Sequence, residues 1–190
     1  MVVDIDFKEL ENKDIVLVIA PDELITQTFI SILSYFVNIK DSYCIYVTIN
    51  KPYTTLVNIL HNNNIKTDKM FFVDAITRLG GAGMQRAGNC VFCQTPTSLT
   101  AMSIALGRVM ETIPKDRPRI LFLDSLSTLL VYNQAGTVAK FAHFLTTKMR
   151  FHEVKGIVLS LEAEADKEVI NQLSQFCDAV IRVKEKEKTA

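Results

Sequence analysis

A carboxylate and a hydroxyl stand side by side at the end of one strongly apolar segment. Asp124 and Ser125 directly follow Arg119 to Leu123 (RILFL), a pattern that is typical of a buried strand. A carboxylate in that place can be a Mg²⁺ ligand, usually together with substrate phosphates. It can also cap the following turn and bond to nearby serines and threonines. The choice between these roles depends on whether the chain has a phosphate site.

The spacing of Cys90 and Cys93 matches the CxxC pattern of zinc and redox sites. The segment Cys90 to Gln94 is predicted to be a strand, and residues three apart on a strand point to opposite faces. The chain has no second CxxC pair, and its three histidines are isolated in sequence. We therefore expect all four cysteines to be reduced structural residues, and we expect no metal site.

Composition and charge limit the classes of partner. The 190 residues carry 21 Lys+Arg and 21 Asp+Glu, and the formal net charge of zero removes the main electrostatic argument for nucleic acid or an anionic membrane. The N-terminus lacks an apolar signal core, and no apolar run approaches the ~20 residues of a membrane span. We expect one cytoplasmic domain over residues 1–190, with its core at about 14–183 and a solvated charged tail at 184–190.

Short β-branched runs alternate with longer helical patterns along the chain. The predicted strands are Ile15 to Ala20, Tyr43 to Ile49, Met70 to Asp74, Cys90 to Gln94, Arg119 to Leu123, Gly156 to Leu161 and Ala179 to Val183. The predicted helices are Asp22 to Val37, Pro52 to about Asn62, Thr97 to Thr112, Ala135 to Arg150 and Ala165 to Gln175. Asp22 is placed to cap the first of these helices.

This alternation predicts an α/β fold with a mainly parallel twisted sheet and helices on both faces. The strand at the C-terminal edge could run in either direction. Ligands of such sheets bind at the carboxyl ends of the strands. The glycine-rich segment from Leu79 to Asn89, flanked or entered by Arg78 and Arg86, is the best candidate for a mobile recognition loop.

Three segments, taken in order, resemble the KaiC-like branch of the RecA-type ATPases. They are Tyr46 to Thr77 (YVTINKPYTTLVNILHNNNIKTDKMFFVDAIT), Ile120 to Leu130 (ILFLDSLSTLL) and Phe176 to Val183 (FCDAVIRV). The family has, at the matching places, a strand ending in two glutamates before a proline-opened helix, a Walker B strand ending in Asp-Ser, and a closing phrase like ADGVIRL. The resemblance implies a RecA-like three-layer domain, a cytoplasmic protein of archaeal type, and an active ATPase of the same superfamily as a partner.

The phosphate site departs from this family. A P-loop needs glycines to wrap the phosphates with backbone N–H groups, a lysine for the terminal phosphates, and a hydroxyl for Mg²⁺. The turn after the first strand is APDELITQTF, in which the lysine position is Gln27 and the second glycine position is Thr26. Only the hydroxyl remains, as Thr28. Asp22 and Glu23 also place two carboxylates where a helix N-terminus would otherwise favour phosphate.

The family's two glutamates, one of which would activate the attacking water, correspond to Asn50 and Lys51, and neither can serve as that base. We therefore expect a non-catalytic KaiC/RecA-like domain that has lost nucleotide hydrolysis, has no cofactor, and regulates or scaffolds by binding another protein. Homo-oligomerisation is left open. The alternative is a divergent ATP-binding enzyme that uses Asp124 and Thr28 without a standard P-loop. Nucleic-acid binding is a weaker third hypothesis, which the neutral charge disfavours.

Overall fold

The computed structural model describes residues 3–81, 87–162 and 167–186 of the chain. The strands are β1 (Val3–Asp4), β2 (Ile15–Ala20), β3 (Tyr43–Thr48), β4 (Met70–Asp74), β5 (Cys90–Phe92), β6 (Arg119–Asp124), β7 (Lys155–Leu161), β8 (Ala179–Arg182) and β9 (Lys184–Glu185). The α-helices are α1 (Phe7–Asn12), α2 (Ile25–Leu33), α3 (Tyr53–Asn62), α4 (Leu99–Thr112), α5 (Leu126–Tyr132), α6 (Ala135–Phe151) and α7 (Lys167–Ser174). The short elements are the 3₁₀ turns η1 (Asp22–Leu24) and η3 (Thr77–Gly80) and the π-helix η2 (Ser34–Ile39).

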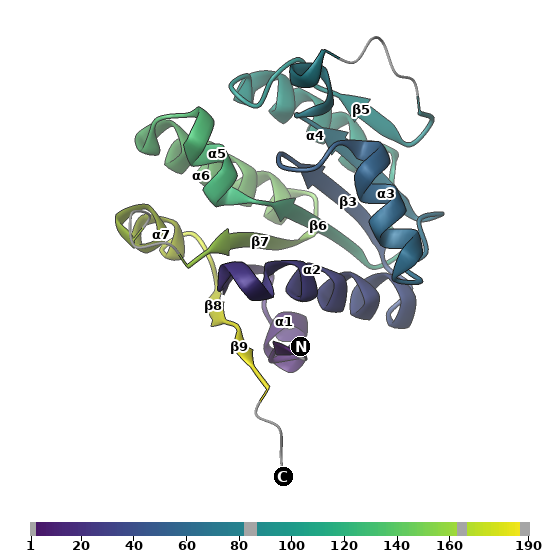
Figure 1. The fold of residues 1–190 in the computed structure, drawn as a ribbon, viewed down its shortest axis with the longest axis vertical. Helices are drawn as coiled ribbons and strands as arrows, with labels where there is room; N and C mark the ends of the chain where they lie inside the picture. The colour runs from purple at the N-terminus through teal and green to yellow at the C-terminus, as the bar shows by residue number, and fades with distance from the viewer. Residues whose placement is uncertain (1–2, 82–86, 163–166, 187–190) are drawn as a thin grey trace.

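Seven strands form one sheet in the order β5-β4-β3-β6-β7-β2-β8, and every neighbouring pair in it is parallel (Figure 1). The prediction of a mainly parallel sheet with helices on both faces is confirmed. The edge strand β8 is itself parallel to β2. Antiparallel pairing of strands occurs, within the described ranges, only between β1 and β9, which form a separate two-stranded sheet.

Both faces of the sheet are covered, as the continuous apolar strands require. Ile15, Leu17 and Ile19 of β2 pack with α4, α5 and α6 on one face, whereas Val16 and Val18 pack with α1, α2 and α3 on the other. Each of these five side chains is at most 1% exposed. Figure 1 shows the two helical layers on either side of the sheet. The strand pattern thus fixes a three-layer domain.

Several elements of the structure were not expected from the sequence. Helix α1 inserts the fully buried Leu10 into the core, and α5 follows β6 almost directly. The predicted charged tail begins with Lys184 and Glu185, which form β9, although their side chains stay exposed. Short elements escape periodicity analysis because a single helical turn or a two-residue strand has no measurable period.

Parallel strands place all their carboxyl ends along one edge of the sheet and all their amino ends along the other. We call these the carboxyl edge and the amino edge. No helix in the described part of the chain is both long and apolar enough to cross a membrane.

Candidate functional site

The residues matched to the nucleotide site of the family lie at the carboxyl edge, on segments that follow β2, β3 and β6. Strands β3 and β6 are neighbours, and their last residues, Thr48 and Asp124, are in register. The loop after β3 carries Asn50 and Lys51, and the segment after β2 carries Thr26, Gln27 and Thr28. The sheet therefore brings together two of the three segments directly, with the third one on α2.

The segment after β2 closes into a tight turn. Pro21 is followed by the 3₁₀ turn η1, after which α2 begins at Ile25. Asp22 does not cap this helix as we expected, since neither η1 nor α2 has a side-chain hydrogen bond at its N-cap. The reason is that η1 continues directly into α2, so the first N–H groups of α2 meet carbonyls of the preceding turn.

The three side chains matched to the phosphate loop differ in their exposure to solvent. Thr26 and Gln27 are exposed on α2, whereas Thr28 is completely buried. The hydroxyl of Thr28 donates a hydrogen bond of 2.8 Å to the carbonyl oxygen of Leu24, one turn earlier. A threonine hydroxyl bonded to its own helix in this way is common. Its oxygen faces the protein interior, away from a position where it could meet a metal in solvent.

Asp124 lies at the centre of this region and is 2% exposed. Its Oδ2 accepts a hydrogen bond of 2.6 Å from the hydroxyl of Tyr46, and the ammonium of Lys51 lies 3.4 Å from the same oxygen. The Lys51 ammonium also lies 5.1 Å from the ring centroid of Phe29 on α2. Lys51 therefore spans from the β3–α3 loop to the carboxylate and covers the aromatic ring of α2.

Tyr46 is a hydrogen-bond donor to this carboxylate. Its ring is fully buried and stacks on Phe122, with ring centroids 5.3 Å apart. Burial, and then the negative charge of Asp124, raise the pKa of the Tyr46 hydroxyl well above its usual range. The hydroxyl is therefore protonated at neutral pH and donates to Asp124.

Ser125 performs the capping role that the sequence had left open for Asp124. Ser125 is the N-cap of α5, its Oγ accepts from the Thr128 N–H at 3.3 Å, and its Oγ lies 2.8 Å from the Thr128 hydroxyl. Asp124 instead bonds to Tyr46 and Lys51, across the sheet rather than along the chain. Asn50 is exposed next to this group.

A second buried carboxylate at the same edge was missed by sequence reasoning. Asp74 ends β4, is fully buried, and accepts hydrogen bonds from the Tyr53, Ile76 and Thr77 N–H groups at 2.7–2.8 Å and from the Thr77 hydroxyl. It thus caps α3 from a neighbouring strand. The signal was present, since Asp74 ends an apolar strand just as Asp124 does.

The CxxC pair belongs to no metal-ligand cluster of the described residues, and residues 82–86 of the predicted recognition loop lie outside them. Cys93 packs with the residues on the α4 face of the sheet and Cys90 with those on the α3 face, as expected for a strand. Burial raises the pKa of the Cys93 thiol to about 11. Arg78 lies in η3, and Arg86 is outside the described residues. Within the described ranges no three His, Cys, Asp or Glu side chains gather closely enough to hold a metal.

The geometry defines what the site can do. Two buried carboxylates at the carboxyl edge have all their identified partners inside the chain, and the one matched to a metal ligand is already neutralised by an ammonium. A divalent cation would have to displace Lys51 before it reached Asp124. The site is built as an internal charge pair.

Comparisons with known proteins identify a family for this chain and solved structures with a similar fold. A family model described as a family of unknown function (DUF7504) matches residues 41–183. The KaiC-like protein PH0186 from Pyrococcus horikoshii has a similar structure with a TM-score of 0.62, at 13% identity over 92% of this chain and 73% of that one. The uncharacterized protein PH0321 from the same organism, solved with an unknown peptide, has a TM-score of 0.67 and 16% identity over 96% and 84%. No match was found among curated proteins.

Proposed function

The chain belongs to the family of unknown function DUF7504, its fold is KaiC-like, and from this premise we propose that it is a non-catalytic KaiC/RecA-like domain. In this proposal the chain has lost nucleotide hydrolysis and acts in the cytoplasm as a regulatory or scaffolding protein. Its partner is another protein, and an active ATPase of the same superfamily is the first candidate. The proposal has two parts, the loss of chemistry and the gain of a binding role.

One observation carries the loss of chemistry. Asn50 and Lys51 stand where KaiC-like ATPases have a pair of glutamates, and the Lys51 ammonium lies 3.4 Å from Asp124, the carboxylate matched to their Mg²⁺ ligand. The change of this pair thus removes the general base, and its lysine neutralises the matched metal ligand. The hydroxyl of Thr28 is also engaged, because it donates a hydrogen bond to the carbonyl oxygen of Leu24. Both groups that the alternative ATP-binding hypothesis needs, Asp124 and Thr28, are engaged by other groups of the chain.

The binding role is supported by the surface and by one structural neighbour. Phe144 and Phe151 on α6 and Ile104 on α4 are 45%, 82% and 52% exposed. The Lys148 ammonium lies 5.4 Å from the Phe144 ring centroid, and it is close enough to α4 that a Cβ atom on Gly107 would be 2.6 Å from it. Helices α4 and α6 contact each other, and we infer that their exposed apolar side chains contribute to one interaction surface. PH0321 was solved with a bound peptide, which supports a binding role for this fold.

Nucleotide binding is tested by thermal unfolding with and without MgATP. A ligand at 100 times its Kd adds about 2.7 kcal/mol to the free energy of unfolding, which corresponds to a Tm increase of several degrees for a domain of this size. We expect no change in Tm at millimolar MgATP. A clear increase would instead favour the divergent ATP-binding enzyme that uses Asp124 and Thr28.

Protein binding is tested by affinity purification from the native organism followed by mass spectrometry. The matched bait is a double variant, Phe144→Ser with Phe151→Ser, which removes the two exposed rings of α6 and leaves the buried face of that helix unchanged. We expect the wild-type chain to enrich a specific protein that the variant loses. Equal enrichment by both baits would contradict a role for α6, and enrichment of no protein by either would contradict the binding role.

A further inference from the structure

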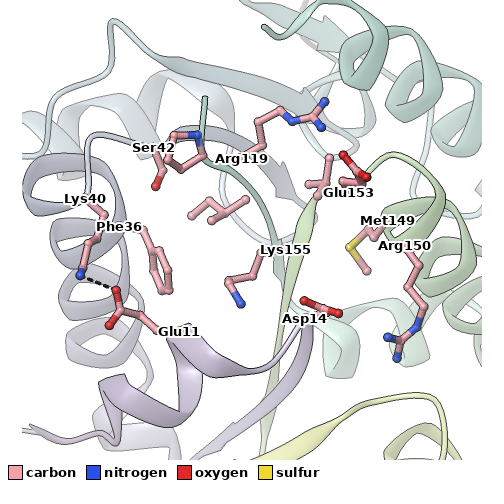
Figure 2. Close-up of a pocket in the computed structure, with 13 residues that line it drawn as sticks. Glu11, Asp14, Phe36, Lys40, Ser42, Arg119, Met149, Arg150, Glu153 and Lys155 are labelled. Carbon is pink, nitrogen blue, oxygen red and sulfur yellow. Dashed lines mark ion pairs between the residues drawn. The ribbon is translucent and has the colours of Figure 1, made fainter. Parts of the chain in front are cut away.

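A pocket of about 570 Å³ opens at the amino edge (Figure 2). The candidate site lies at the other end of the strands, at the carboxyl edge. The pocket lies where four neighbouring strands begin, because Asp14, Ser42, Arg119 and Lys155 stand at or just before the starts of β2, β3, β6 and β7. Its apolar lining includes Phe36, Ile120, Met149 and Val154. Pockets of this volume and mixed lining are typical of sites for small organic ligands.

The buried ionic groups of this pocket are cations with incomplete partners. Arg119 is 6% exposed, its Nη2 donates 2.6 Å to the His152 carbonyl, and its Nη1 is buried without a partner in the described chain. Lys155 is partly buried and donates to the carbonyl oxygen of Lys13. Neither cation forms an ion pair with a carboxylate of the described residues. Each of these two cations has one carbonyl oxygen as its direct hydrogen-bond partner among the described residues.

The carboxylates around the pocket compensate these cations only in part: Asp14, Asp178 and Glu11 favour the charged form of Lys155, but their effect is smaller than that of burial. Glu11 is paired with Lys40, as the dashed line in Figure 2 marks. Asp14 and Glu153 are exposed, so water solvates them. Arg150, a further cation of the lining, is already paired with Asp178 at 2.8 Å. The buried part of the pocket is therefore positive, and its solvated rim is negative.

An unpaired cation out of water is costly, and an anion beside it restores part of the lost solvation energy. In Figure 2 the side chain of Lys155 extends into the pocket between Phe36 and Asp14, so a ligand could reach its ammonium directly. Burial also lowers the pKa of the Lys155 ammonium, which shows that nearby carboxylates do not fully offset its desolvation.

We propose that this pocket binds a small organic anion, with its carboxylate or phosphate group against Lys155 and its apolar part against Phe36 and Ile120. Arg119, which also lines the pocket, contributes positive potential. The proposed interaction with Lys155 is non-covalent, and the proposal includes no chemical reaction. The proposal is independent of the proposed function, because it uses none of the residues at the carboxyl edge.

Two aromatic anions and one neutral analogue test the site in the full chain. Benzoate, phenyl phosphate and benzamide are titrated to millimolar concentrations while the backbone amide signals are followed by ¹H–¹⁵N NMR. We expect saturable shifts of the Ser42, Ile120 and Lys155 amides with at least one anion and none with benzamide. Shifts with benzoate alone identify a carboxylate site, and shifts with phenyl phosphate alone identify a phosphate site.

Substitutions of Lys155 then test whether this side chain contributes to binding. We expect Lys155→Gln to weaken binding about tenfold or more, Lys155→Arg to retain it, and Lys69→Gln, a cation outside the pocket, to leave it unchanged. The proposal is overturned if neither anion gives saturable shifts in the wild-type chain. Equal shifts with benzamide, or unchanged affinity in Lys155→Gln, overturn it as well.

Discussion

The two edges of the central sheet hold buried charge in different ways. At the carboxyl edge, Asp124 has a tyrosine hydroxyl and a lysine ammonium, and Asp74 has four donors. At the amino edge, Arg119 and Lys155 have one carbonyl each, beside a pocket of about 570 Å³. The edge where parallel α/β sheets bind ligands pairs its buried carboxylates internally, whereas the opposite edge leaves its buried cations incompletely paired beside a pocket.

This difference predicts how each edge affects the stability of the fold. At the carboxyl edge each buried carboxylate has partners that offset its desolvation, so the loss of one partner lowers the stability of the fold. Incomplete pairing at the amino edge costs stability and leaves charge available for a ligand. Removing a buried carboxylate at the carboxyl edge should therefore lower the free energy of unfolding, whereas removing the Lys155 ammonium at the amino edge should not.

The largest effect is expected from Asp74→Ala. This change leaves three N–H groups and one hydroxyl without their acceptor in a buried place, which should lower the free energy of unfolding by about 3–4 kcal/mol. The measurement is chemical denaturation of the purified variant. The matched control is Asp178→Ala at the amino edge, which loses an exposed ion pair with Arg150 and one hydrogen bond from the buried Ile15 N–H, and we expect a smaller loss there. Equal losses in the two variants would show that the edges do not differ.

A smaller loss is expected from Lys51→Met, which leaves the Asp124 carboxylate without its cation. Because the Lys51 side chain is 21% exposed, we expect about 2 kcal/mol, below the usual cost of breaking a fully buried pair. Adding Asp124→Asn should recover most of this loss, since the uncompensated charge is then gone. Lys69→Met, which breaks the exposed pair with Asp41, serves as the control and should cost much less. A double variant no more stable than Lys51→Met would contradict the pairing.

The smallest effect, with the opposite sign, is expected from Lys155→Gln. Removing this partly desolvated ammonium should leave the free energy of unfolding unchanged or raise it by about 0.5 kcal/mol. The folded-state pKa of Lys155 lies below its unfolded value. The wild-type chain should therefore gain stability relative to Lys155→Gln as the pH rises from the folded pKa to the unfolded one. Denaturation of both proteins at neutral pH and at about pH 10 measures this gain, and a relative loss would contradict it.

The sequence determined the sheet and most of its helices. A continuous apolar run such as Ile15–Ala20 can be buried only with both faces covered, so it predicts a central parallel strand without knowledge of its neighbours. The same local information identified Asp124 and Ser125 at a strand end and showed that the turn after β2 lacks glycine and lysine. These features depend on residues that are close together in the chain.

Only the tertiary structure decided which groups meet. Lys51 and Asp124 are 73 residues apart and come together because β3 and β6 are neighbours in register. Asp74 caps α3 from another strand, and the amino-edge pocket exists because four strand starts converge on it. Strand order and register arise from packing over the whole chain. Local periodicity therefore shows which residues are buried, but the fold alone determines which buried charges find partners and which remain open to a ligand.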